Sequence, residues 1–76
     1  MNFRRHPDYA LPPHVFAIWT APAGPHLFTI TRDAHGFSVS IANEHDRERR
    51  WISGSPFGSF KEAASAAAAT WRAKQQ

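Results

Sequence analysis

Five histidines are the residues in this chain that first raise the question of metal chemistry: His6, His14, His26, His35 and His45. They stand far apart in the sequence, and none belongs to a His-x-His or His-Glu-x-x-His spacing, which would place two ligands on one face of a strand or helix. A site would need several of them to converge with a carboxylate such as Asp46, and the spacing does not predict this. We therefore expect no native metal site and no cofactor.

The serines give no sign of nucleophilic catalysis. Ser55 lies in the stretch 54–58 (Gly-Ser-Pro-Phe-Gly), one place too early for the Gly-x-Ser-x-Gly elbow of hydrolases. The same stretch lacks the Gly-x-x-x-x-Gly-Lys pattern of a phosphate-binding loop. A domain of 76 residues also has little core to spare for a pocket. We expect no catalytic residues and a chain that is not an enzyme.

Tryptophan and arginine are residue types that dominate binding interfaces, and several of them fall in strand-like parts of this chain. The net charge is +3, with nine Lys and Arg against six Asp and Glu, which favours an acidic partner: either a protein or nucleoprotein surface or a nucleic acid. The residues that we predict to contact this partner are Trp19, Arg47, Arg49, Arg50 and Trp51.

Length and composition limit the class of protein. Seventy-six residues make one small domain, which buries only roughly 60% of its unfolded surface. There is no cysteine, so the chain has no disulfide framework and suits a reducing cytoplasm. No run of about 18 apolar residues is present, and the first residues lack the hydrophobic core of a signal peptide. We expect a soluble protein of the host-cell cytoplasm with no membrane partner.

The clearest structural element is a helix over residues 59–72. Ser59 followed three residues later by Glu62 forms a capping box, the usual start of a helix. Arg72 and Lys74 stand in the last turn, where the helix dipole favours cations. One stripe with bulky ends and alanines between them suits close packing on a sheet: Phe60, Ala64, Ala67 and Trp71.

Four strand candidates precede this helix, at residues 14–20, 26–32, 37–41 and 49–53. Alternation is clearest over 37–41, and the stretch 33–36 ends in glycine, which predicts a hairpin between the second and third strands. Residues 21–25 read as a turn or short loop. The charged run 43–50 is typical of a solvated loop that leads into the fourth strand.

The expected fold class is α+β: an antiparallel β-meander of three to four strands with one C-terminal helix packed on one face, in the order β-β-β-β-α. Residues 1–13 form an extended N-terminal arm, and residues 14–76 form a single domain. Phe3, Tyr9 and Leu11 are candidates to pin the arm to the domain. A sharper alternative is a basic arm that reaches a nucleic-acid groove through Arg4 and Arg5.

Alternation assigns the strand residues to two faces of the sheet. The helix side is predicted to hold Phe28, Ile30, Phe37, Val39, Ile41 and Ile52. The opposite side is predicted to hold Trp19, Thr29, Thr31, Ser38, Ser40, Arg49 and Trp51. A one-residue error of register would exchange the faces, and the first and fourth strands are the most exposed to it. The alternative is ordinary polar surface, with one tryptophan folded under the arm.

The stretch 50–64 resembles the strand-to-helix passage of small sheet-plus-helix proteins from phages and mobile elements, in which a Gly-Pro-Phe-like turn leads into an alanine-rich helix. The resemblance covers about the last third of the chain. It implies one of two families. One comprises small phage-encoded inhibitors of the anti-CRISPR type, which block a surface of a large nucleoprotein complex. The other is the three-strand-plus-helix DNA-binding domain of phage integrases and plant AP2 factors.

Two functional hypotheses follow. The first is a non-enzymatic inhibitor that sterically blocks a host defence complex. The second is a small basic nucleic-acid-binding module whose sheet reads duplex DNA. The chain departs from the DNA-binding pattern because the predicted centre of the open face is Thr29, Thr31, Ser38 and Ser40 in place of a dense row of arginine and lysine. A homodimer through an apolar strand face or an unpaired strand edge stays open as well.

Overall fold

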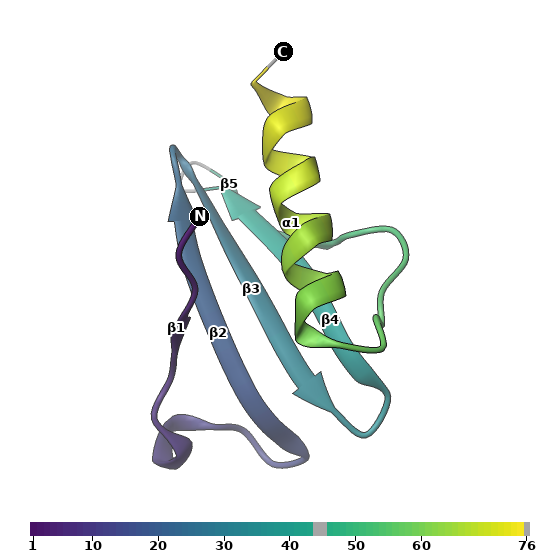
Figure 1. Ribbon diagram of the computed structural model, residues 1–76. Helices are drawn as coiled ribbons and strands as arrows, with labels where there is room; N and C mark the ends of the chain where they lie inside the picture. Colours follow the sequence, from purple (N-terminus) through teal and green to yellow (C-terminus); the bar gives the residue numbers. More distant parts are fainter. Residues whose placement is uncertain (44–45, 76) are drawn as a thin grey trace.

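The computed structural model describes the backbone of residues 1–43 and 46–75, and the side chains of the same residues except 46–48. Five antiparallel strands form one open sheet in the order β1-β2-β3-β4-β5, and one helix packs on one of its faces (Figure 1). The elements are β1 (Arg4–Arg5), a single 3₁₀ turn (Asp8–Ala10), β2 (Val15–Ala23), β3 (His26–Asp33), β4 (Gly36–Asn43), β5 (Asp46–Trp51) and α1 (Phe60–Lys74). The predicted α+β meander with a C-terminal helix is confirmed, with one short strand added.

The start of α1 is the capping arrangement that the sequence predicts. The Oγ of Ser59 accepts a hydrogen bond from the backbone N–H of Glu62, at 3.2 Å. The Glu62 carboxylate accepts in return from the N–H of Gly58, at 3.1 Å, one residue before the expected partner. These bonds satisfy backbone donors that have no partner inside the helix, and they set where the helix begins.

The core lies between α1 and the sheet. Ala63 and Ala67 are fully buried on the helix, and they face a cluster that includes fully buried Phe28, Ile30 and Val39. Alanine side chains are short, so the helix axis can approach the sheet closely and let the larger strand residues fill the space. The six residues predicted for the helix side all belong to this core or pack against it.

The β3–β4 hairpin is tied to the segment that precedes α1. Asp33 pairs with Gly36 at the hairpin, where Gly36 has a φ of +126°. Next to it, Phe37 and Phe57 exchange two backbone hydrogen bonds, of 2.9 and 2.6 Å. A Cβ on Gly36 would lie only 2.6 Å from the carbonyl oxygen of Phe57. Glycine is therefore required where the two segments meet.

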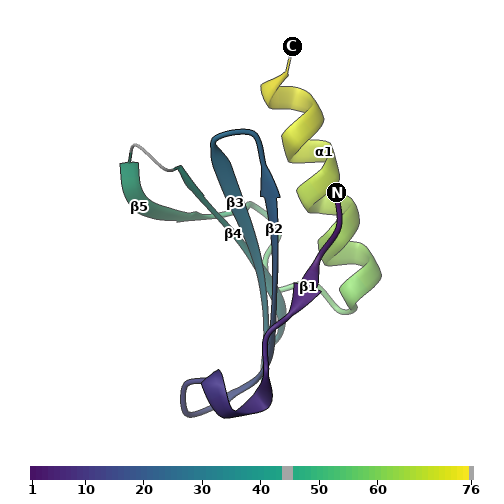
Figure 2. The same cartoon turned by 90° about the vertical axis from the view of Figure 1, so that its left-hand side faces the viewer.

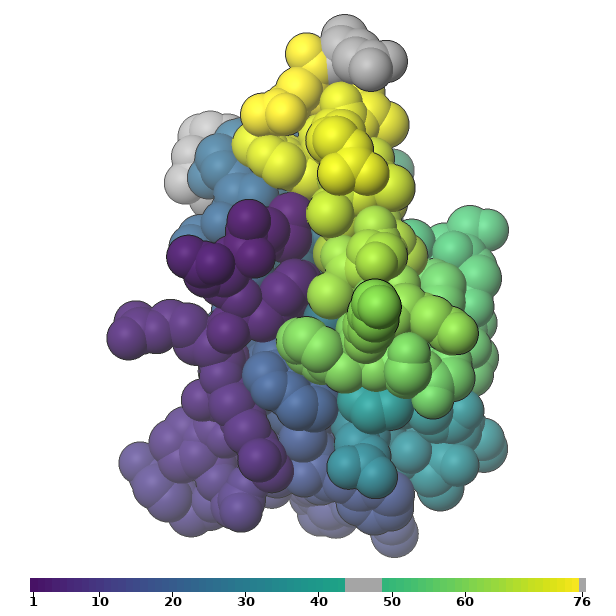
Figure 3. All heavy atoms as spheres, viewed as in Figure 1, coloured from purple at the N-terminus to yellow at the C-terminus, as the bar shows by residue number. Residues whose placement is uncertain are grey.

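The N-terminal arm is attached to the domain by backbone and side-chain contacts. Its strand β1 pairs with the middle of β2. The ring of Phe3 meets the ring of Phe60 edge-on, with the centroids 5.9 Å apart. Figure 3 shows the first residues of the chain (purple) lying beside α1. The prediction that Phe3 pins the arm is confirmed, whereas the same prediction for Tyr9 is wrong because this residue is 92% exposed.

Two strand boundaries differ from the prediction. Residues 21–23 continue β2, and the turn is limited to Gly24 and Pro25. Pro22 is tolerated because β1 pairs only with the middle of β2, so this part of β2 is a sheet edge that needs no N–H donor on its outer side. The charged run predicted as a loop is β5 from Asp46 onward, and residues 44–45 lie outside the described residues. Charged side chains on an edge strand discourage pairing with other chains.

Candidate binding surface

One row of residues crosses the whole sheet on the side away from α1. Pairing between neighbouring strands lines up one residue from each strand, from β1 to β5: Arg4, Thr20, Thr29, Ser40 and Trp51. Residues directly opposite in antiparallel strands point to the same face. Since Thr29 and Ser40 alternate with core residues that meet the helix, the row marks the opposite face. We call this face, with Thr31, Ser38, Leu27, Ala42 and Pro22 in the neighbouring rows, the free face.

Trp51 is the most prominent apolar side chain of the free face. It is 58% exposed, at the end of the edge strand β5. Arg49, two residues before Trp51 on the same edge strand, is also exposed. The sequence-based placement of Trp51 on the open face is confirmed by its pairing with Ser40, whereas the same placement of Arg49 stays a prediction. An exposed tryptophan beside an arginine is the pairing of residue types found at interface hot spots.

The centre of the free face carries hydroxyl side chains that are buried from solvent. Ser40 is 1% exposed and Thr29 is 8% exposed, although both point away from the helix as predicted. Both stand on the two middle strands, where neighbours on each side shield them. Figure 2 shows β5 curving away from α1 toward this side of the sheet. The two central side chains are therefore shielded from solvent, and the most exposed side chains of the free face stand at its edges and its ends.

The β1 edge carries a second cation on this face. Arg4 is exposed and begins the cross-sheet row opposite Thr20. Its neighbour Arg5 points to the helix side, with its guanidinium 5.9 Å from the ring of Trp19. The two arginines of the arm are thus divided between the two faces, and they do not form the joint basic contact that the sequence suggested.

The prediction that Trp19 lies on the open face is wrong. Its ring packs on Phe60 of α1, with the centroids 4.8 Å apart, and lies 6.0 Å from the ring of Phe37. Both faces of β2 are apolar, so alternation did not decide between them. The signal that was missed is the set of small residues in phase with Trp19, namely Ala17, Ala21 and Ala23, which are buried on the helix side.

Two further arginines were predicted as partner contacts. Arg50 pairs with Ile41, which places it on the helix side of β5, although it is exposed. The side chain of Arg47 lies outside the described residues. Of the five predicted contact residues, the structure places Trp51 on the free face, with exposed Arg49 two residues before it on the same strand, and it places Trp19 and Arg50 on the helix side.

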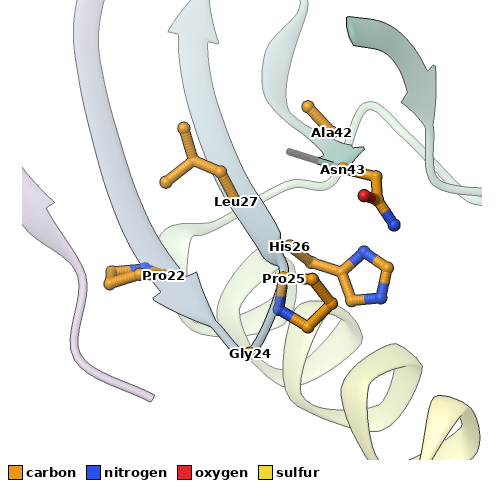
Figure 4. Close-up of a pocket in the computed structure, with 7 residues that line it drawn as sticks. All are labelled: Pro22, Gly24, Pro25, His26, Leu27, Ala42 and Asn43. Carbon is orange, nitrogen blue, oxygen red and sulfur yellow. The ribbon is translucent and has the colours of Figure 1, made fainter. Parts of the chain in front are cut away.

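An open hollow lies at one end of the free face, and sequence analysis did not identify it. It has a volume of about 470 Å³ and is lined by Pro22, Gly24, Pro25, His26, Leu27, Ala42 and Asn43 (Figure 4). Its walls come from the β2–β3 turn and the end of β4. The Nδ1 atom of His26 is buried, and no described residue forms a hydrogen bond with it. Leu27 at the edge of the hollow is 43% exposed.

Ser55 and His6 form contacts that belong to the fold. Ser55 accepts a hydrogen bond from the N–H of Val39, at 3.1 Å, and so extends the pairing of β4 past the end of β5. His6 Nε2 lies 3.1 Å from the hydroxyl of Thr20 on the free face. Among the described side chains, those of residues 1–43 and 49–75, no group of three or more metal-ligating residues comes together, and His45 and the side chain of Asp46 lie outside these ranges.

In comparisons with known proteins, no protein-family model matches the chain, and neither a curated protein nor a solved structure matches it. In the described part of the chain, no helix has the length and apolar character needed to cross a membrane.

Proposed function

We propose that this chain is a non-enzymatic binding protein that acts by covering a surface of a larger partner with the free face of its sheet. In its specific form, the proposal is a phage- or mobile-element-encoded inhibitor of the anti-CRISPR type, which blocks a host defence nucleoprotein complex in the host cytoplasm. This form rests on the resemblance of residues 50–64.

The observation that carries the proposal is the exposure of Trp51 on a sheet face that no element of the described chain covers, with exposed Arg49 two residues before it on the same edge strand. A tryptophan in water exposes apolar surface that a partner would bury, and each Å² of apolar surface removed from water contributes about 25 cal/mol. Arg49 and Arg4, at opposite edges of the face, favour an acidic surface on that partner.

Capture from a host lysate tests this proposal. The full chain is immobilised and compared with Trp51→Ala, with nuclease-treated and untreated lysate, at moderate salt. We expect one stoichiometric partner that survives nuclease and is lost with Trp51→Ala. The control is Tyr9→Ala, which removes another exposed aromatic residue outside the row. The proposal is wrong if Trp51→Ala captures the same partner as strongly as the natural chain.

Charge reversal separates the two faces of β5. Arg49→Glu reverses the charge at the position in phase with Trp51, whereas Arg50→Glu changes the neighbouring residue on the helix side. We expect Arg49→Glu to weaken capture of the partner more than Arg50→Glu does. Equal effects would mean that the partner contacts the edge of β5 and not the free face.

Nucleic-acid binding is the second candidate function, and the position of Arg4 favours it. Arg4 lies on the same face as Trp51, and exposed Arg49 lies on the same strand as Trp51. The isoelectric point of the chain is about 10.2. Duplex affinity would then fall with salt, with a slope of about −0.9 in log K against log salt for each neutralised phosphate. A flat slope, or no binding at low salt, would rule out this function.

A further inference from the structure

The hollow at the end of the free face continues the exposed apolar surface around Trp51. Leu27 pairs with Ala42 in the row next to the one that contains Thr29, Ser40 and Trp51. Strands are about 4.8 Å apart, so Ala42 and Trp51 are diagonal neighbours on the same face. A partner that contacts Trp51 would reach the hollow without leaving the face.

The lining of the hollow selects an apolar group. Four of its residues present carbon surface, namely Pro22, Pro25, Leu27 and Ala42, and polar side chains stand only on the side of His26 and Asn43. The volume of about 470 Å³ is within the range of sites that take a whole small ligand, and it is large enough for a bulky side chain. Because the hollow is open, a group presented by a macromolecule can enter it directly.

The charged residues near the hollow indicate which charge the partner carries around its apolar group. Arg4 and Arg49 are exposed at the two edges. The described carboxylate on this face is that of Asp33, which lies at the opposite end of β3 from the hollow and accepts a hydrogen bond from the N–H of His35, at 2.8 Å. Acidic groups on the partner would therefore meet cations at both edges.

The width of the face limits the shape of the partner. Four strand intervals separate β1 from β5, which makes about 19 Å measured along the sheet, and β5 curves toward the side of the free face (Figure 2). A helix with its side chains is about 10–12 Å wide, so one helix fits between the two edge arginines. We infer that the free face receives an acidic amphipathic helix of a protein partner, with one bulky apolar side chain of that helix in the hollow. This inference rests on the proposed function.

Peptide binding to the full chain tests the inference. The probe is a tryptophan-free helical peptide with leucine and phenylalanine on one face and glutamate on the other. Its affinity is measured from the anisotropy of a dye on the peptide and from the tryptophan emission of the protein. We expect saturable binding that is at least tenfold tighter than that of the same peptide with lysine in place of glutamate.

Two variants locate the binding site. Ala42→Phe fills the hollow with an aromatic ring, and phenylalanine is a residue type that β-strands favour. Leu27→Asp places a negative charge at the rim of the hollow. Each should weaken binding at least tenfold, whereas Tyr9→Ala should leave it unchanged. Circular dichroism and thermal unfolding of each variant show that the fold is retained, and the two variants act through different chemistry, so a folding defect in one leaves the other informative.

Three results would overturn the inference: no binding of the glutamate peptide, equal binding of the glutamate and lysine peptides, or full affinity in both variants of the hollow. Preference for single-stranded oligothymidylate over the peptide would overturn it as well, and would assign the arginines to phosphate. If the lysate partner is still captured in a Trp51-dependent way by Ala42→Phe, the proposed function stands and only the role of the hollow is wrong.

Discussion

At Gly36 the absence of a side chain allows two segments to meet, and this gives a sharp prediction. The Cβ of Gly36→Ala would lie 2.6 Å from the carbonyl oxygen of Phe57, which is backbone and cannot swing aside. The φ of +126° is also one that residues with a Cβ rarely adopt. We expect the free energy of unfolding to fall by about 2–4 kcal/mol, measured by urea denaturation followed by circular dichroism.

Gly58→Ala is the matched control. A Cβ there would lie 3.6 Å from the Glu62 carboxylate, an ordinary contact, and the residue is exposed. The change in unfolding free energy should stay within about 0.5 kcal/mol. Similar losses in the two variants would show that the contact between the hairpin and Phe57 does not set the cost at Gly36.

The residue scale also shows where sequence reasoning succeeds and fails on the candidate site. Trp51 was placed correctly because it alternates with Ile52, which packs against the core on the helix side. Trp19 was misplaced because Phe16, Ile18 and Val15 make both faces of its strand apolar. The hollow could not be predicted because it depends on where the β2–β3 turn and the end of β4 meet.

At the scale of elements, the helix was predictable because three local signals agree: the cap at Ser59, the carboxylate at Glu62 and the cations of the last turn. The hairpin of β3 and β4 was predictable because hydroxyl and apolar residues alternate. The charged first part of β5 was predicted as a loop because charged side chains indicate exposure to solvent. On an edge strand, exposed charged residues can still pair through their backbone. The short β1 has only two residues, too few for any period.

The flat contact between α1 and the sheet predicts how the helix responds to larger side chains. Ala67 is fully buried, so Ala67→Leu forces extra methyl groups into a filled space and should lower the free energy of unfolding by about 1–3 kcal/mol. Ala69→Leu makes the same change two residues later at an exposed position. It should have little effect, because leucine and alanine are both good helix formers. Thermal unfolding of the two variants checks the prediction.

If Ala69→Leu were the more destabilising variant, the face of α1 that meets the sheet would have to be reassigned. If both were neutral, the interface would contain room that the buried alanines do not suggest. Either result would contradict the close approach of α1 to β3 and β4.

At the scale of the whole molecule, the sheet is a platform with one covered face and one that no described element covers. The helix and the arm share the covered face: Phe3 meets Phe60 there, and the Arg5 guanidinium lies over Trp19. The arm also contributes Arg4 to the free face. The same short segment therefore supports the core and supplies one edge of the proposed binding surface.

Removal of residues 1–6 separates these two roles. The shortened chain loses the Phe3 ring contact, the pairing of β1 with β2 and the contact of His6 with Thr20. We expect the fold to be retained by circular dichroism, with a loss of about 1–2 kcal/mol in stability and a thermal midpoint lower by about 4–8 °C for each kcal/mol. The full chain with Arg4→Ala should keep its midpoint, because Arg4 is exposed, and should lose only affinity for an acidic partner. Equal midpoints for the shortened and full chains would show that the arm lies on the domain without stabilising it.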